Sequence, residues 1–335
     1  MAPNQEIPLI DVSGLLCGTG EGLSKTAADV GAACRAAGFF YVVNHNVPTD
    51  LIDAAFRKSK EFFSLDPPRK EEISYFRSPH NRGYIGFLKE ALHPSKPPDL
   101  KEAFNIGLDL APDDPDVLAG KAFRGVNLWP GDPEFREVML AYFGSLWKLG
   151  RELHRAFATD LALPTDHFED KLDRPMAILR LLHYMPMPDH LEAGQLGAGE
   201  HTDYGNITLL ATDAVGGLEV RTRSGEWIAA PPFPNAFICN IGDCLMRWTN
   251  EVYVSTPHRV VPPKDTERYS IAFFLDPNPD AIVECVPSCV GPGRPPLYPA
   301  IRGEDFLRSR LEPSYAHNKA YEAGIGHVLD GRVPA

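Results

Sequence analysis

Three side chains in the second half of the sequence have the chemistry and the spacing to hold one metal ion. His201 and Asp203 form an H-x-D pair, and His258 lies much further along the chain. On a β-strand, residues i and i+2 point to the same face, so an imidazole and a carboxylate at this spacing can bind one ion together. A histidine from a distant strand would complete a site of two imidazoles and one carboxylate. Such a site occupies one side of the ion and leaves the opposite coordination positions open.

A further pair of polar residues follows His258. Arg268 and Ser270 again share one face of a predicted strand. An arginine guanidinium binds a carboxylate with two parallel charge-assisted hydrogen bonds, and a serine hydroxyl can add a third. Two histidines and one carboxylate with open positions are typical of non-haem Fe(II) oxygenases. Together these residues favour an iron site with a dicarboxylate co-substrate beside it.

Two other H-x-E pairs compete for the metal assignment, His167 with Glu169 and His190 with Glu192. The first lies in a charged segment that is predicted to be helical, where residues i and i+2 do not face together. The second lies in a Pro-rich loop. Neither pair has a histidine at a similar distance downstream. We therefore expect neither pair to hold a metal.

Composition and charge exclude several classes of partner. The chain has 335 residues, of which 44% are hydrophobic, and a formal net charge of −12. It has no basic cluster of the kind that binds a phosphate backbone, which argues against nucleic acid. No apolar run approaches the roughly 18 residues that a membrane span requires. The segment Met1 to Leu9 has neither a basic start nor a long apolar run, which argues against a signal peptide. A small-molecule partner is therefore expected, and the sequence specifies no oligomeric state.

The six cysteines include no C-x-x-C pair. In a long chain without a secretion signal, free thiols in a reducing cytoplasm are expected. Cys285 and Cys289 have a helical spacing that could bind a metal, but Pro287 lies between them and unpaired cysteines are usually buried hydrophobic residues. We therefore predict a cytoplasmic protein with free cysteines.

Apolar patterning predicts helices in the first half and strands in the second. Helices are expected at residues 24–37, 50–63, 135–157 and 304–310, strands at 7–12 and 39–43, and a long loop at 80–98. Later strands are expected at 177–182, 207–212, 217–220, 227–229, 236–240, 252–255, 269–275 and 282–285. Many short strands indicate a β-sandwich or barrel. We predict one catalytic unit over residues 1–335, with a mostly helical part and contributing strands at 1–175, a β core carrying the site at 176–290, and a helical tail at 291–335.

Several ordered segments carry a family resemblance, at residues 7–11, 37–45, 200–210, 240–243 and 258–277. They resemble the isopenicillin N synthase-like branch of the 2-oxoglutarate/Fe(II) oxygenases over most of the chain. The resemblance implies a mainly β fold with flanking helices, in which a double-stranded β-helix (jelly-roll, cupin-like) core follows N-terminal helices. It also implies that His201, Asp203 and His258 bind Fe(II), and that Arg268 and Ser270 bind the distal carboxylate of 2-oxoglutarate.

The resemblance extends to other residues and also shows departures. Tyr184 occupies the position of a tyrosine that contacts the same carboxylate in relatives. Leu182 stands where many relatives have Asn, so one hydrogen bond to the co-substrate is expected to be missing, and Asn46 stands where Gly is usual. Residues 179–184 and 200–210 resemble fungal thymine hydroxylases, which implies a small planar or heterocyclic substrate. Aromatic residues expected to line the substrate pocket, with plain core positions as the alternative, are Tyr84, Phe104, Trp248 and Phe274.

The reaction implied by the resemblance is the oxidation of a small organic molecule by O₂, in which 2-oxoglutarate is decarboxylated to succinate and CO₂. Fe(II) is the implied cofactor, with ascorbate as the reductant in vitro. One alternative is a 2-oxoglutarate-independent Fe(II) oxidase on the same fold. The C-terminal Gln ligand of isopenicillin N synthase has no counterpart, because no Gln follows Gln195. A second alternative is a non-enzymatic jelly-roll binding protein, which would need neither His201 nor Asp203.

Overall fold

The computed structural model describes residues 7–17, 20–92, 96–187 and 194–315. The first half contains β1 (Leu9–Asp11), α1 (Ser13–Leu16), α2 (Gly20–Ala36), β2 (Phe39–Val43), α3 (Thr49–Phe63), α4 (Pro67–Glu71), β3 (Gly83–Ile85), β4 (Lys101–Gly107), α5 (Pro115–Leu118) and α6 (Pro133–Asp160). The second half contains β5 (Ile178–Tyr184), β6 (Ala198–His201), β7 (Ile207–Thr212), β8 (Leu218–Arg221), β9 (Trp227–Ala229), β10 (Phe237–Ile241), α7 (Asp243–Trp248), β11 (His258–Val260), β12 (Arg268–Leu275), β13 (Ile282–Val283), β14 (Ile301–Arg302) and α8 (Gly303–Tyr315). Short 3-10 helices lie at Tyr75–Arg77, Glu169–Lys171 and Pro287–Cys289. Among the helices described, none is long and apolar enough to cross a membrane.

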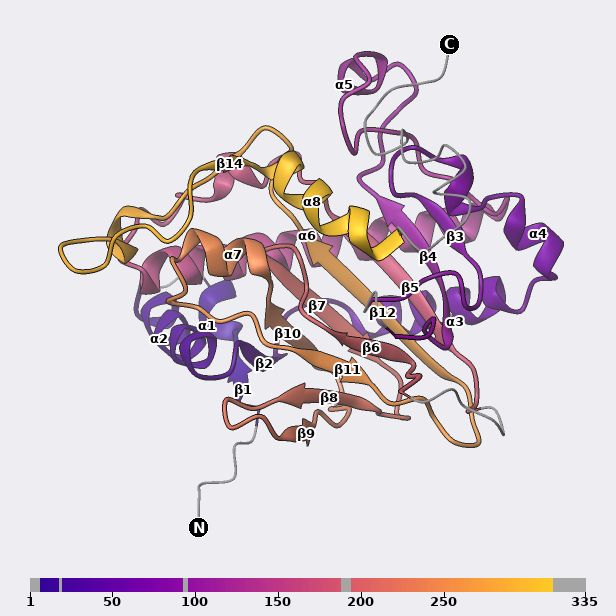
Figure 1. The fold of residues 1–335 in the computed structure, drawn as a ribbon, viewed down its shortest axis with the longest axis horizontal. Coiled ribbons are helices and arrows are strands. Elements are labelled where there is room, and N and C mark those ends of the chain that lie inside the picture. Colours follow the sequence, from indigo (N-terminus) through magenta and orange to yellow (C-terminus); the bar gives the residue numbers. More distant parts are fainter. Residues whose placement is uncertain (1–6, 18–19, 93–95, 188–193, 316–335) are drawn as a thin grey trace.

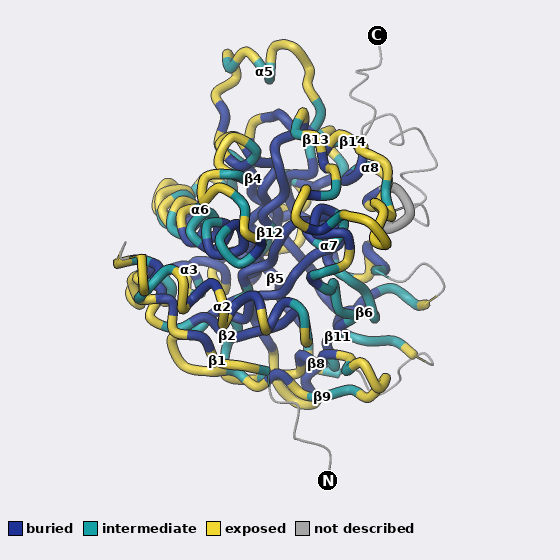
Figure 2. The backbone as a smooth tube through the Cα atoms, turned by 90° about the vertical axis from the view of Figure 1, so that its left-hand side faces the viewer, coloured by how far each residue is buried: buried dark blue, intermediate teal, exposed yellow. Residues whose placement is uncertain are grey.

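Two sheets form the centre of the molecule (Figure 1). The larger has eight strands in the order β1-β2-β10-β7-β12-β5-β4-β3, and the smaller has four in the order β6-β11-β8-β9. In Figure 2, helices α2, α3 and α6 lie on one side of β5 and β12, and the smaller sheet lies on the other. The smaller sheet therefore faces the larger one across the interior of the molecule, as expected for a jelly roll.

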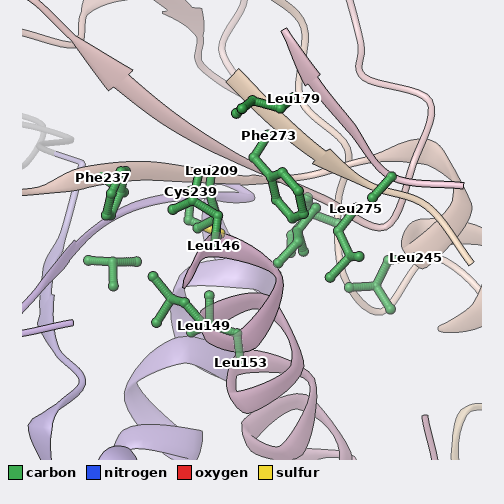
Figure 3. Packing of buried hydrophobic residues seen from close by; sticks show 14 of the residues in the cluster. Leu146, Leu149, Leu153, Leu179, Leu209, Phe237, Cys239, Leu245, Phe273 and Leu275 are labelled. Atoms are coloured by element: carbon green, nitrogen blue, oxygen red, sulfur yellow. The ribbon is translucent and has the colours of Figure 1, made fainter. Parts of the chain in front are cut away.

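Helix α6 covers the outer face of the larger sheet. The apolar stripe predicted at residues 135–157 lies within it. Figure 3 shows where the stripe meets the sheet, through Leu146, Leu149 and Leu153 of the helix, Leu179 of β5, Leu209 of β7, Phe237 and Cys239 of β10, and Phe273 and Leu275 of β12. These side chains are almost completely removed from water, so their burial is a main source of stability.

Strands β5 and β12 separate this core from the interior between the sheets. They pair antiparallel, with Arg268 opposite Tyr184 and Phe274 opposite Ile178. Side chains alternate between the two faces of a strand. The apolar residues at odd positions of both strands join the core against α6, and those at even positions turn toward the interior. A shift of one residue in this register would exchange the two sets.

Two turns near β2 explain local sequence choices. Gly38 has a φ of 65°, and a methyl group there would lie 2.1 Å from the carbonyl oxygen of Val254, so only glycine fits. Asn46, at a position where the resemblance implies glycine, has a φ of 57°. Asn tolerates this left-handed conformation better than most residues, so the departure preserves the backbone path.

The structure corrects parts of the predicted element pattern. Residues 252–255 do not form a strand. The Tyr253 side chain is buried and its hydroxyl donates to Asp160 at 2.6 Å, so this apolar run packs into the core as a loop. Strands β3 and β4 were not predicted, and β3 lies inside the predicted loop at 80–98.

Candidate active site

The three predicted metal ligands meet at the smaller sheet. His201 is the last residue of β6, His258 is the first of β11, and the two are register partners. Asp203 lies two residues beyond the end of β6, so the prediction that it shares a strand with His201 is wrong. The chain nevertheless returns the carboxylate to the imidazoles, because one ligand atom from each of the three residues lies within 4.8 Å of the others. Within the described part of the chain, no other set of His, Cys, Asp and Glu side chains meets in this way.

Each histidine ring is held by its second nitrogen. Nδ1 of His201 donates to the carbonyl of Gly199 at 2.7 Å, and Nδ1 of His258 donates to the carbonyl of Thr256 at 3.1 Å. These contacts place the proton on Nδ1 and leave a lone pair on Nε2. The two Nε2 atoms lie 3.6 and 3.5 Å from Oδ1 of Asp203. Three electron-pair donors therefore converge on one point.

The carboxylate of Asp203 is oriented in the same manner. Its Oδ2 accepts hydrogen bonds from the hydroxyl of Thr208 and from Nδ2 of Asn240, the latter at 2.7 Å. Sequence reasoning did not assign a role to Thr208 or Asn240. Both are polar residues within the largely apolar sequences of β7 and β10, and both are buried. The polar residue within an apolar strand was the sequence signal that could have indicated a role at the site.

Burial and mutual charge set the protonation of the three ligands. Burial, and then the neighbouring His258, lower the pKa of His201 to about 3. Burial by itself raises the pKa of Asp203, but the two imidazoles and the hydrogen-bond donors around it hold that pKa below its usual value. Burial by itself lowers the pKa of His258, but the Asp203 carboxylate raises it above its usual value. An ionised carboxylate beside imidazole nitrogens is a donor set that fits Fe(II).

Arg268 and Ser270 point into the interior from β12. The guanidinium is buried, its Nε donates to the carbonyl of Gly216, and its Nη1 donates to the hydroxyl of Ser270 at 3.2 Å. The Nη2 atom is also buried and has no hydrogen-bond partner among the described residues. A buried guanidinium nitrogen without an acceptor is unfavourable. This arrangement therefore fits an incoming carboxylate.

Tyr184 and Leu182 lie beside this arginine on β5. Cζ of Arg268 lies 4.6 Å from the centroid of the Tyr184 ring, a cation–π contact that fixes the plane of the guanidinium. Leu182, at a position where the resemblance implies Asn, lies opposite Ser270 and lines the same cavity. An apolar side chain at this position contributes packing and no hydrogen bond.

A cavity between the two sheets brings these residues together. All three predicted metal ligands and all three predicted co-substrate residues line it, as does Phe274. Its walls come from β2, β4, β5, β7, β10 and β12 of the larger sheet, from β6, β8 and β11 of the smaller sheet, and from Leu307 and Leu311 of helix α8.

The other three aromatic residues predicted for the pocket lie elsewhere. Tyr84 and Phe104 are register partners on β3 and β4, and both join the core on the helix side of the sheet. The Phe104 ring lies 4.6 Å from that of Phe62. Trp248 of α7 joins the same core, with its ring 5.4 Å from that of Phe168. The structure corrects the prediction for these three residues, because their strand faces or helix sides turn away from the cavity.

A buried charge network along one wall of the cavity was not predicted. Lys101 pairs with Asp99 and lies 3.1 Å from Glu90, which also pairs with Arg180 at 2.5 Å. Two positive and two negative charges balance, so this wall offers fixed hydrogen-bonding groups rather than net charge. Asp99 and Lys101 are only two residues apart, but Arg180 is 90 residues from Glu90, so no local sequence pattern could have revealed the whole network.

The competing metal assignments gain no support. His167 lies in a turn just before the short helix that contains Glu169, and neither joins a metal-binding group. His190 and Glu192 lie outside the described residues. All six cysteines are free thiols, and none joins such a group.

Comparisons with known proteins agree with this geometry. The family model described as non-haem dioxygenase in morphine synthesis N-terminal matches residues 7–132, and the model of the 2OG-Fe(II) oxygenase superfamily matches residues 175–277. The chain is 34% identical over 328 residues to the 2-oxoglutarate-Fe(II) type oxidoreductase hxnY of Emericella nidulans, covering 96% of this chain and 94% of that one. It is 38% identical over 296 residues to homoarginine-6-hydroxylase 2-ODD-233 of Oryza sativa subsp. japonica, covering 84% and 89% of the two chains.

Solved structures extend the likeness to three dimensions. A full-length protein of Neurospora crassa, solved in complex with alpha-KG, superposes with a TM-score of 0.80 at 34% identity, covering 91% of this chain and 95% of that one. The complex of the same Neurospora protein with alpha-KG and thymine gives a TM-score of 0.79 at 33% identity, with 91% and 96% coverage. The predicted mainly β fold with a double-stranded β-helix core is confirmed, and the non-enzymatic alternative is set aside. The chain belongs to the isopenicillin N synthase-like branch of the 2-oxoglutarate/Fe(II)-dependent oxygenases, enzymes that use Fe(II), 2-oxoglutarate and O₂ to oxidise small molecules.

Proposed function

We propose that His201, Asp203 and His258 hold the Fe(II) ion of this enzyme. The observation that carries the proposal is the convergence of three donor atoms, one from each side chain, within 4.8 Å. The remaining nitrogen or oxygen of each side chain is held by a hydrogen bond, which orients the donor toward the shared point. Two imidazoles and one carboxylate on one side of an ion suit an Fe(II) oxygenase.

We propose that Arg268, Ser270 and Tyr184 receive the distal carboxylate of 2-oxoglutarate. The buried Nη2 of Arg268 lacks an acceptor among the described residues, and the Ser270 hydroxyl lies 3.2 Å from Nη1 of the same guanidinium. A carboxylate between these groups would satisfy the unpaired donor. The Tyr184 ring supports the guanidinium plane, which is the geometry that two parallel hydrogen bonds need.

When bound, Fe(II) and 2-oxoglutarate supply the O₂-dependent oxidation of a substrate C–H bond, with release of succinate and CO₂. The protein binds and orients the reactants and keeps water away from them. Phe274, Leu307 and Leu311 give the cavity apolar surface that excludes water. The balanced charges of Glu90 and Arg180 in the cavity lining supply hydrogen-bonding groups in a fixed geometry.

We propose that the substrate is a small planar molecule with polar edges, which the enzyme hydroxylates or otherwise oxidises. The likeness to the thymine complex of the Neurospora crassa protein supports this proposal, as does a cavity that offers both an aromatic ring and buried polar groups. The name of a similarly related protein, homoarginine-6-hydroxylase, indicates a different kind of substrate. A substrate screen therefore has to include flexible amino acids too.

We propose that residues 1–335 act as one catalytic unit, with a mostly helical part at 1–175, the catalytic core at 176–290 and a C-terminal part at 291–335. In this last part helix α8 spans Gly303–Tyr315, and the predicted helical tail beyond it, at 316–335, lies outside the described residues. Support comes from the larger sheet, in which β1 to β4 hydrogen-bond in one array with β5, β7, β10 and β12. We also propose a cytoplasmic location, which the six free cysteines support. The net charge of −12 argues against nucleic acid as a partner.

The test is a substrate screen that measures succinate formation with Fe(II), ascorbate and 2-oxoglutarate. The expected result is that one class of small molecule raises succinate formation above the level without substrate, in proportion to oxidised product. Turnover of a substrate in the absence of any 2-oxoacid would instead favour the oxidase alternative.

A further inference from the structure

Strand β12 presents a row of alternate side chains to the cavity. Arg268, Ser270, Ala272 and Phe274 line it in order, and Asp276, just past the end of the strand, lines it at the same spacing. Eight residues of strand span about 26 Å, which is more than an arginine side chain and a five-carbon dicarboxylate cover together. A co-substrate held by Arg268 therefore cannot also be the partner of Asp276.

Asp276 lies close to the metal end of this row. Its neighbour Phe274 pairs with Thr208, the residue whose hydroxyl donates to Asp203. A methyl group added at Gly205 would lie only 2.7 Å from Oδ1 of Asp276, so the carboxyl packs against the loop that follows Asp203. The carboxyl thus lies in the part of the cavity next to the loop that follows the metal ligand Asp203.

Asp276 is the one acidic residue of the described cavity wall whose carboxyl has no hydrogen-bond or ion-pair partner among the described residues. Its side chain is buried, with 5% of the residue exposed. The other acidic wall residues are paired, Glu90 with Lys101 and Asp203 with Asn240. A buried polar group without a partner is unfavourable, and such groups in native proteins usually have a functional reason. Because the carboxyl lines the cavity, a molecule bound there can satisfy it.

We propose that Asp276 is a substrate-binding residue that accepts a hydrogen bond from an N–H or O–H group of the substrate. This inference rests on the proposed function of the cavity and narrows its substrate class. The substrate is a small molecule that carries a hydrogen-bond donor near the carbon that is oxidised. Molecules of the same shape whose donor is blocked by a methyl group leave the carboxyl unpaired and are rejected.

A purely structural role for Asp276 makes a different prediction. If the carboxyl only supports the loop at Gly205, its replacement should lower thermal stability and weaken all ligands alike. Asp276→Asn keeps the size and one acceptor oxygen but removes the charge, and Asp276→Leu removes both hydrogen-bonding oxygens. The readout that separates the two roles is discrimination between ligands with and without a donor, since loop support does not change it.

The experiment measures binding by calorimetry to the Fe(II)- and 2-oxoglutarate-loaded protein without O₂. The probes are two matched pairs, thymine with 1,3-dimethylthymine and phenol with anisole. In the unmodified protein, at least one donor-bearing member should bind about 10-fold or more tightly than its methylated partner, the discrimination expected when a buried polar group is left unpaired. Asp276→Asn should reduce this preference and Asp276→Leu should abolish it.

No donor preference in the unmodified protein, or the same preference in Asp276→Leu or in Asp276→Asn, overturns the inference. A 2-oxoglutarate titration of each protein keeps this outcome separate from failure of the proposed function. Normal 2-oxoglutarate binding without donor preference contradicts only the role of Asp276. Failure of the unmodified protein to bind 2-oxoglutarate contradicts the proposed site itself.

Discussion

The two faces of strands β5 and β12 differ sharply although they are made by alternating residues of the same segments. The outer face carries Leu181, Ile271 and Phe273, which pack against the helices in a dry core. The inner face carries Arg180, Arg268 and Ser270, which line the cavity. Both faces hold a buried polar atom without a hydrogen-bond partner among the described residues, the Tyr142 hydroxyl in the outer core and Nη2 of Arg268 on the inner face, but only the second belongs to a residue that lines the cavity.

This difference shows how one sheet serves stability and chemistry at once. On the outer face, His154 of α6 donates from Nδ1 to the carbonyl of Gly150, and its Nε2 accepts from Nδ2 of Asn206. On the inner face, Nη2 of Arg268 and the carboxyl of Asp276 have no protein partner among the described residues. Burial and the nearby Asp203 carboxylate raise the pKa of Asp276 to about 7, which reflects the same lack of pairing.

The largest effect is expected from His258→Ala. Removing one of three ligands should abolish stoichiometric iron binding and with it succinate formation, because two donors hold Fe(II) far less tightly. Iron content per chain after dialysis is the measurement. His167→Ala is the matched control and should retain one iron per chain. Full iron content together with turnover in His258→Ala would contradict the assignment.

Neighbouring phenylalanines on opposite faces of β12 provide the next comparison. Phe273 is fully buried, with its ring 5.0 Å from that of Phe143. Phe273→Ala should lower the free energy of unfolding by about 3–5 kcal/mol because it leaves a cavity in the core. Phe274→Ala removes a half-buried ring from the cavity wall, so it should cost less stability and change substrate binding instead. Denaturant unfolding and substrate titration of both variants test this, and equal losses of stability would break the comparison.

Acid sensitivity should arise partly from His154 on the outer side. Burial lowers the pKa of His154 to about 4, below the ordinary value of 6.5. Between pH values of about 4 and 6.5, His154 is therefore protonated in the unfolded chain but neutral in the folded chain. The stability from neutral His154 is complete above pH 6.5 and is lost as pH falls toward 4, by about 3 kcal/mol in total. In metal-free protein, His154→Gln should flatten this decline, and an unchanged pH slope would contradict the prediction.

A smaller effect is expected from Arg268→Lys on the inner face. Lysine keeps the charge but loses the planar two-pronged donor. Losing about 1.5–3 kcal/mol of charge-assisted hydrogen bonding should raise the KM for 2-oxoglutarate by about 10- to 150-fold and leave kcat nearly unchanged. Iron content should not change. A variant with normal KM and lower thermal stability would show that Arg268 is only structural.

Arg259→Lys is the control for that variant. Arg259 directly follows His258 on β11, but its Nε lies 2.7 Å from Glu219 and its Cζ lies 4.1 Å from the Trp227 ring, outside the cavity lining. Its substitution should leave the KM for 2-oxoglutarate alone. If only this variant lost co-substrate affinity, the wrong arginine would have been assigned.

Long periodic elements and ordered motifs were predictable from the sequence. The stripe at 135–157 predicted α6 almost completely, since its apolar spacing is strictly helical. Strand β4 was not predictable, because its polar Lys101, Glu102 and Asn105 are buried against partners from distant segments, such as Lys70 beside Glu102. Period-two alternation predicts that residues share a face but does not say which face meets the cavity.

Because alternation does not say which strand face meets the cavity, some predicted site residues line the cavity and others do not. His258, Arg268 and Ser270 belong to motifs with a fixed order, and all three line the cavity. Phe104, by contrast, lies on β4 between Ala103 and Asn105. Because neighbouring residues of a strand face opposite sides, Phe104 faces the helices and not the cavity. Asp276 carried no motif at all, and only its burial without a partner singles it out.

The most direct test of the central claim is an anaerobic titration of 2-oxoglutarate into the Fe(II)-loaded protein, followed by the visible charge-transfer absorption of an iron-bound 2-oxoacid. If the inner faces of the two sheets gather both reactants, the absorption should saturate at one 2-oxoglutarate per iron and one iron per chain. It should be absent in His258→Ala and need much more co-substrate in Arg268→Lys. Binding of 2-oxoglutarate without this absorption, or an unchanged titration in both variants, would contradict the account.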